Sequence, residues 1–158
     1  MFWQKEMETM DREQLSKLQL SRLQWTVNNC YDHVPFYRGR LDEAGIAPRD
    51  IRSLDDLKYI PLTDKCHFRD HYPYGLFARP MNDIVRVQGS SGTTGKPTIV
   101  GYTRNDLSTW TDLVARLLVA VGVTEKDVAQ VAFGYGLFTG AHGLHQALDR
   151  IGGRSEER

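Results

Sequence analysis

The stretch Gln88-Gly89-Ser90-Ser91-Gly92-Thr93-Thr94-Gly95-Lys96-Pro97-Thr98 decides how the rest of the chain is interpreted. All seven residues from Gly89 to Gly95 are glycine, serine or threonine, and a lysine follows them directly. Glycines let successive backbone N–H groups turn toward one anion, and hydroxyl groups add further donors. A lysine brings a positive charge on a flexible stem, which suits a phosphate oxygen. The stretch therefore predicts a phosphate-binding loop, formed by Ser90, Ser91, Gly92, Thr93, Thr94, Gly95 and Lys96.

Short apolar segments flank this loop on both sides. Residues 84–87 and 98–102 are typical of strands, and Thr103 is placed to cap a helix over about 104–121. A third strand is expected over 127–133, followed by a helix over about 141–151. The alternation of strands and helices predicts an α/β fold.

Two other interpretations of the loop are weaker. A flexible Gly/Ser/Thr linker is the common meaning of such a composition, but the flanking strands and the terminal Gly-Lys-Pro argue against it. A Walker A loop requires G-x-x-x-x-G-K-[ST] at the start of a helix. Here Ser90 takes the place of the first glycine, and Pro97, which follows Lys96, disfavours a helix there. A P-loop kinase or NTPase is therefore not expected.

The composition excludes several classes of protein. Lys plus Arg and Asp plus Glu number 20 each, so no nucleic-acid or membrane-surface partner is indicated. No apolar run approaches the roughly 18 residues of a membrane span, and the N-terminus does not resemble a signal peptide. Cys30 and Cys66 stand apart without metal-ligand spacing, so we expect reduced thiols in a cytoplasmic protein and no metal centre built from them.

The chain divides into three parts by pattern. Residues 1–80 predict a helical lead-in, whose first helix spans about 11–32 with Asp11 as its cap. Residues 81–151 form the α/β part with the phosphate-binding loop, and residues 152–158 form a polar tail. No strand is expected after the last helix. With about three strands, the predicted sheet is incomplete.

The loop resembles the phosphate-loop motif of the adenylate-forming superfamily, and other stretches are similar to phenylacetate–CoA ligases, the enzymes of phenylacetate catabolism. The resemblance covers about residues 8–151, and its most specific part beyond the loop is Tyr135-Gly136-Leu137-Phe138-Thr139-Gly140. Further similar stretches are Val34-Pro35-Phe36-Tyr37-Arg38, Pro61-Leu62-Thr63-Asp64-Lys65, Tyr72-Pro73-Tyr74-Gly75-Leu76 and Val100-Gly101-Tyr102-Thr103. It implies a helical lead-in and the first strands and helices of an adenylate-forming N-terminal domain.

The resemblance also implies a reaction. The family joins an aryl acid to the α-phosphate of Mg-ATP and then transfers the acyl group from AMP to coenzyme A. The resemblance assigns the loop and the catalytic Lys96 to the β- and γ-phosphates. It assigns Tyr135, Phe138 and Gly140 to the aryl-acid pocket. The implied cofactors and partners are ATP, Mg²⁺, coenzyme A and phenylacetate or a related acid. His142 and His145 share one helix face, and we interpret them as packing or surface residues with a pocket role as the alternative.

Some residues depart from the family pattern. Gln88-Gly89 stands where the family has His-Ala, and Gln146 stands where it has an aromatic residue. The family continues well beyond Ile151, into regions that carry its magnesium, ribose and adenylation residues. We therefore expect a frameshifted or truncated N-terminal part that is inactive alone. The alternative is a non-catalytic phosphate- or nucleotide-binding module, which forms a homodimer or pairs with a separately encoded remainder.

Overall fold

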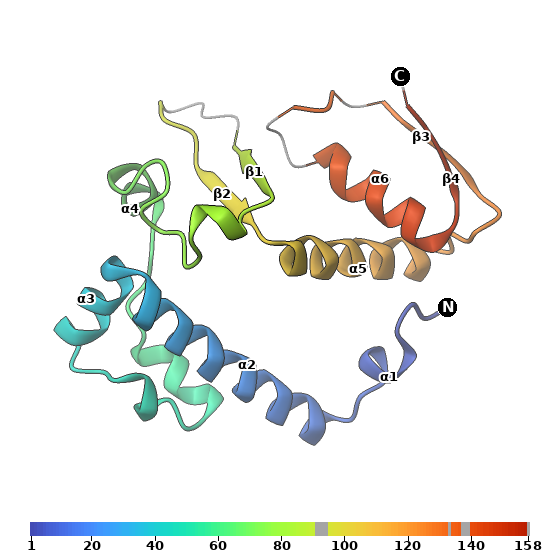
Figure 1. The fold of residues 1–158 in the computed structure, drawn as a ribbon. Helices are drawn as coiled ribbons and strands as arrows, with labels where there is room; N and C mark the ends of the chain where they lie inside the picture. Colours follow the sequence, from blue (N-terminus) through green and yellow to red (C-terminus); the bar gives the residue numbers. More distant parts are fainter. Residues whose placement is uncertain (91–94, 133, 137–139, 158) are drawn as a thin grey trace. The chain divides into compact units, whose positions relative to one another are not determined.

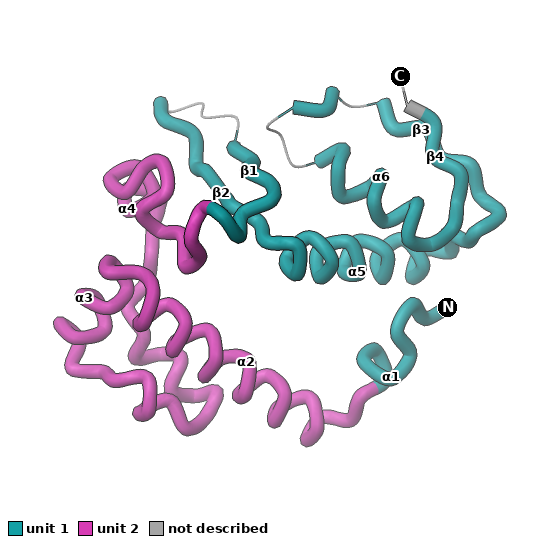
Figure 2. The backbone as a smooth tube through the Cα atoms, in the orientation of Figure 1, with its two compact units in different colours: residues 1–9, 82–158 teal, residues 10–81 magenta. Residues whose placement is uncertain are grey.

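The computed structural model describes residues 1–90, 95–132, 134–136 and 140–157 (Figure 1). The chain forms two compact units, which are coloured separately in Figure 2. One unit consists of residues 10–81, and the other combines residues 1–9 with residues 82–158. The predicted phosphate-binding loop and aryl-acid pocket both fall in the second unit.

The unit of residues 10–81 is helical. It contains α2 (Arg12–His33), α3 (Pro35–Glu43), the 3₁₀ helices η1 (Pro48–Asp50) and η2 (Leu54–Tyr59), and α4 (Lys65–Asp70). The side chain of Asp11 accepts a 2.9 Å hydrogen bond from the backbone N–H of Gln14, which confirms the predicted cap of α2. Its core consists of Val27, Leu41 and Ile51, with Leu23, Tyr31, Ile46 and Ile60 packed against them.

The other unit contains the strands. Its elements are α1 (Lys5–Glu8), η3 (Met81–Asp83, at the junction of the units), β1 (Arg86–Gly89), β2 (Ile99–Tyr102), α5 (Arg104–Ala120), β3 (Val128–Val131), α6 (Gly140–Ile151) and β4 (Arg154–Glu157). β1 and β2 form an antiparallel pair, whose register runs from Arg86 opposite Tyr102 to Gly89 opposite Ile99. β3 and β4 form a parallel pair, in which Val128 lies opposite Arg154 and Val131 lies opposite Glu157. The described strands thus form two small sheets in place of the single sheet of about three strands that was expected, and the fold is α/β and incomplete as predicted.

The expectation that no strand follows the last helix was wrong. Gly152 adopts φ +90°, a left-handed conformation that favours glycine, and turns the chain after α6. The backbone N–H of Arg154 then donates to the carbonyl oxygen of Asp127 at 3.1 Å, at the start of the β3–β4 pairing. The polar sequence hides this strand because it has no apolar alternation, which is the sequence signal of a half-buried strand.

The buried face of α5 also differs from the predicted stripe. The helical spacing of Leu107, Trp110, Val114, Leu117, Leu118 and Val121 predicts an apolar stripe. Of these residues, Leu117 and Val121 are 62% and 73% exposed. The buried residues of α5 are Thr111, Ala115 and Val119, which recur one turn apart.

Small residues bring α5 close to α6. The buried residues of α6 include Ala141, Gly143 and Ala147. A Cβ atom built on Gly143 would lie only 2.7 Å from Cζ2 of Trp110 in α5. Trp110 in turn stacks on Tyr102 of β2, with ring centroids 5.5 Å apart and planes inclined by 13°. These contacts tie the β1–β2 hairpin, α5 and α6 together (Figure 1).

Candidate functional site

The β1–β2 hairpin closes the predicted phosphate-binding loop at its base. The backbone N–H of Ser90 donates to the carbonyl oxygen of Thr98 at 3.0 Å, one step beyond the last strand pair. The backbone N–H of Thr98 donates to Oγ of Ser90, also at 3.0 Å. Ser90 and Thr98 thus hold both ends of the loop together. The predicted binding residues Ser91, Gly92, Thr93 and Thr94 lie outside the described residues.

The positively charged residue of the loop, Lys96, lies on the segment that leads into β2. Gly95 adopts φ +118°, which a residue with a Cβ atom rarely adopts. Lys96 follows and is exposed, at the mouth of the hairpin. Backbone donors, hydroxyl groups and an exposed ammonium group at the end of a hairpin suit an anion with several oxygen atoms.

A buried amide lies beside this loop and was missed by the sequence reasoning. Gln88 of β1 is only 1% exposed, and neither Nε2 nor Oε1 of its side chain has a hydrogen-bond partner among the described residues. Two residues earlier in β1, Nη1 of Arg86 donates to Oε1 of Gln146 in α6 at 3.2 Å. Gln88 and Gln146 are two of the positions at which the sequence departs from the family pattern. In the structure Gln88 is a buried amide, and Gln146 makes a contact between β1 and α6. That departure was the signal that could have identified them.

Tyr135, predicted to lie in the aryl-acid pocket, meets two histidines of α6. Its hydroxyl group lies 3.2 Å from Nδ1 of His145, and Nε2 of His145 lies 3.2 Å from Oδ2 of Asp149. The ring of Tyr135 meets the ring of His142 edge-on, with centroids 5.0 Å apart and planes inclined by 72°. Of the other predicted pocket residues, Gly140 is the exposed first residue of α6, whereas Phe138 lies outside the described residues.

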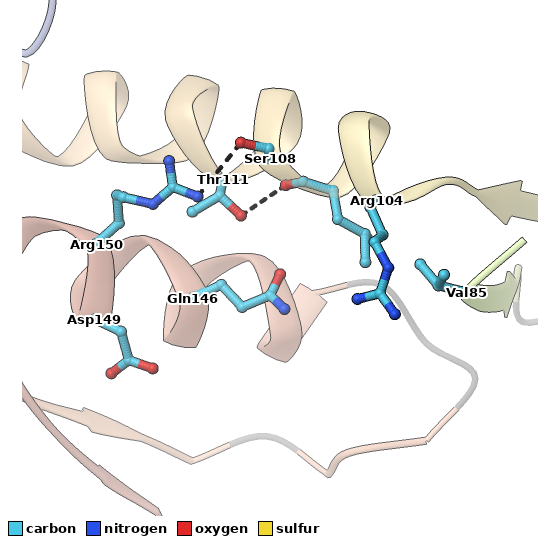
Figure 3. Close-up of a pocket in the computed structure, with 8 residues that line it drawn as sticks. Val85, Arg104, Ser108, Thr111, Gln146, Asp149 and Arg150 are labelled. Atoms are coloured by element: carbon cyan, nitrogen blue, oxygen red, sulfur yellow. Dashed lines mark hydrogen bonds between the residues drawn. The ribbon is translucent and has the colours of Figure 1, made fainter. Parts of the chain in front are cut away.

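A cavity of about 590 Å³ lies between α5 and α6 (Figure 3). Its lining residues are Val85, Arg104, Leu107, Ser108, Thr111, Gln146, Asp149 and Arg150. Nη1 of Arg150 donates to Oδ1 of Asp112 at 3.0 Å, and its Nη2 lies 3.5 Å from Oγ of Ser108. None of the predicted site residues that the structure describes lines this cavity, so the sequence patterns point elsewhere in the same unit.

The described residues meet neither the requirements of a metal site nor those of a membrane-spanning helix. Nowhere in the described ranges do three or more His, Cys, Asp or Glu side chains gather in a way that could hold a metal ion. Within the same ranges, no helix combines the length and apolarity required to cross a membrane.

Comparisons with known proteins give close relatives. No family model matches the chain. The phenylacetate–coenzyme A ligase of Escherichia coli (strain K12) is 50% identical over 145 residues, which are 92% of this chain and 33% of that protein. The phenylacetate–coenzyme A ligase of Thermus thermophilus is 52% identical over 152 residues, which are 96% of this chain and 34% of that protein. The chain thus spans about a third of the length of the curated relatives it matches.

A solved structure supports the same assignment. The 2-hydroxyisobutyryl-CoA ligase, crystallised with 2-HIB-AMP and CoA in the thioesterification state, matches with a TM-score of 0.90 and 31% identity. The match covers 98% of this chain and 34% of that one. The predicted fold is therefore confirmed: the chain matches the N-terminal part of adenylate-forming CoA ligases, over about a third of their length.

Proposed function

We propose that the chain forms the phosphate- and acid-binding part of a phenylacetate–coenzyme A ligase. Nearly its whole length is similar to about one third of the length of each such relative. The reaction is the ATP-dependent activation of phenylacetate, or a related aryl acid, to an acyl-adenylate and then to a CoA thioester. The observation that carries this proposal is the pair of hydrogen bonds between Ser90 and Thr98, which closes a Gly/Ser/Thr loop ending in an exposed lysine.

The loop contributes charge neutralisation. Backbone N–H groups, the hydroxyl groups and Nζ of Lys96 bind the β- and γ-phosphate oxygens, which hold ATP in place and stabilise the pyrophosphate that leaves. Preorganised donors aimed at developing negative charge are worth about 10²- to 10³-fold in rate each.

The described residues near the loop fit phosphate oxygens and do not fit a resident cation. Mg²⁺ prefers carboxylate and phosphate oxygens in octahedral geometry. The described parts of the hairpin, residues 86–90 and 95–102, contain no carboxylate. The described residues of the hairpin therefore bind phosphate oxygens and do not hold magnesium.

The aryl-acid side lies at the start of α6. Tyr135 offers an aromatic wall to a flat ring, and Gly140 leaves room beside it because it has no side chain. Phe138 is assigned to the same pocket from the sequence. In this proposal the carboxylate of the acid points toward the phosphate-binding loop.

A chimera tests the proposal directly. In it, the aligned 145 residues of the Escherichia coli ligase are replaced by the corresponding residues of this chain. We expect phenylacetate-dependent formation of AMP and thioester. Lys96→Ala in the chimera is expected to lower the rate at least about 10-fold, by loss of a phosphate contact. Lys126→Ala is the matched control, since Lys126 is an exposed lysine of the turn before β3. Equal rates for the two variants would remove Lys96 from the phosphate site.

The purified chain tests the alternative role. In that role the chain is a binding module that depends on further polypeptide for catalysis. We expect it to bind ATP, measured by calorimetry, without producing thioester from phenylacetate, ATP and CoA. Thioester formation by the chain alone would contradict this expectation.

A further inference from the structure

A hydrogen-bonded chain of four side chains, Tyr135, His145, Asp149 and Ser155, links the segment before α6 to both α6 and β4. Tyr135, His145 and Asp149 are joined by two contacts of 3.2 Å, as given above. The other carboxylate oxygen of Asp149, Oδ1, accepts a hydrogen bond from Oγ of Ser155 in β4 at 3.3 Å. Both oxygens of Asp149 are therefore engaged, and its carboxylate is fixed from two elements.

The chemistry of these groups sets the direction of the hydrogen bonds. An ionised carboxylate only accepts, so Nε2 of His145 carries a hydrogen. In a neutral imidazole Nδ1 is then the acceptor, and the hydroxyl group of Tyr135 donates to it. Asp149 thus selects one tautomer of His145, as a carboxylate does when it orients an imidazole in a catalytic site.

The ring of Tyr135 is restrained as well as its hydroxyl group. His142 meets the ring edge-on at 5.0 Å, and His145 meets it at 5.9 Å with an interplanar angle of 88°. Edge-to-face contacts of this kind are favourable for aromatic rings. Tyr135 remains 37% exposed, so a restrained residue is still accessible to a ligand. Such a ring forms a binding wall that loses little rotational freedom when a ligand packs on it.

We propose that His145 and Asp149 are positioning residues, which hold Tyr135 as a fixed wall for the aromatic ring of the acid. The inference rests on the function proposed above, and deepens it by naming what makes that pocket selective for flat, aromatic acids. A restrained wall favours a rigid planar ring over a short branched aliphatic acid, because a planar ring gains contact only when the wall keeps its orientation.

The first test determines the tautomer of His145 in the full chain by long-range ¹H–¹⁵N NMR at pH 8. We expect Nε2–H in the wild type. Asp149→Asn keeps the shape but introduces an amide N–H that donates to Nε2, so the Nδ1–H form should increase. Asp112→Asn is the matched control, since Asp112 is a carboxylate of the same unit that pairs with Arg150. An unchanged tautomer in Asp149→Asn would overturn the proposal.

The second test is ligand binding by the same proteins. Phenylacetate is titrated into each protein, and binding is monitored through the ¹³C ring signals of Tyr135. We expect about 2- to 10-fold weaker binding in Asp149→Asn and His145→Gln, and an unchanged affinity in Asp112→Asn. The affinities for 2-hydroxyisobutyrate and for ATP should not change in any of them, which a general loss of structure would not produce.

The outcomes separate the two proposals. Phenylacetate binding that is equally tight in all variants overturns the positioning role and leaves the proposed function intact. Absence of phenylacetate binding by the wild type overturns the aryl-acid ligand, and with it both proposals for this pocket. Tyr135→Phe, which keeps the ring and removes the hydroxyl group, should weaken phenylacetate binding to the same extent as Asp149→Asn.

Discussion

Glycine-to-alanine substitution is expected to destabilise the protein at Gly143, where α5 and α6 approach closely, and to stabilise it at Gly39. Replacing a helical glycine with alanine gains about 1 kcal/mol through helix propensity. At Gly39 in α3 an added Cβ atom has nothing within 4 Å, so Gly39→Ala should stabilise by about this amount. At Gly143 the Cβ atom would lie 2.7 Å from Cζ2 and 3.0 Å from Cε2 of Trp110, closer than real Cβ contacts.

Overpacking of this kind costs roughly 1–3 kcal/mol, which exceeds the propensity gain. We expect Gly143→Ala to lower the free energy of unfolding by about 1 kcal/mol, so that the two variants differ by about 2 kcal/mol. Hydrogen exchange of the amides in α3 and α6 measures each variant in its own unit. If Gly143→Ala slows exchange in α6 as much as Gly39→Ala slows it in α3, Trp110 does not restrict position 143.

Three smaller perturbations test the local structure of the same unit. Thr103→Ala removes a side chain that accepts from the backbone N–H of Asp106, and should cost about 1 kcal/mol in urea unfolding. Gly95→Ala should destabilise the β1–β2 hairpin because its φ of +118° excludes most L-residues; faster exchange of the β2 amides checks this. Hydrogen bonds from the backbone N–H and then the hydroxyl group of Thr124 lower the pKa of Asp127. Its stabilisation is therefore present above the unfolded pKa of about 3.9 and disappears as the pH falls through the lower folded pKa. Asp127→Asn should unfold more easily than the wild type at pH 7 and lose this difference near pH 2.

Helix starts were predictable because they depend on neighbouring residues. An aspartate or threonine before a helix, with a partner three residues later, satisfies backbone donors without help from distant parts of the chain. Thr103 and Asp106 form such a capping box at α5, as the sequence predicted. Asp64 likewise accepts from the backbone N–H of Cys66 at the start of α4.

The buried face of α5 was not predictable because it depends on its partner. The largest apolar residues of α5 suggest a face that includes Leu117 and Val121. In the structure the buried residues of α5 are Thr111, Ala115 and Val119, while Trp110 lies against Gly143 of α6. β4 was missed for a similar reason, since a polar edge strand forms only when a partner such as β3 is present.

The phosphate-binding loop could be predicted from the sequence, whereas the surroundings of Tyr135 could not. The loop ends are joined by Ser90 and Thr98, eight residues apart, so composition and flanking strands were enough to suggest a phosphate site there. The setting of Tyr135 depends on His145, Asp149 and Ser155, which come from two elements. The sequence suggested a packing or surface role for His145 and a polar tail around Ser155, and it did not single out Asp149. A hydrogen-bonded chain of this kind has no sequence spacing of its own, because the turn between α6 and β4 decides whether its last member reaches the others. The same reasoning implies that exchanging the loop alone between relatives transfers phosphate binding, whereas transfer of the aromatic wall requires residues 135–155 together.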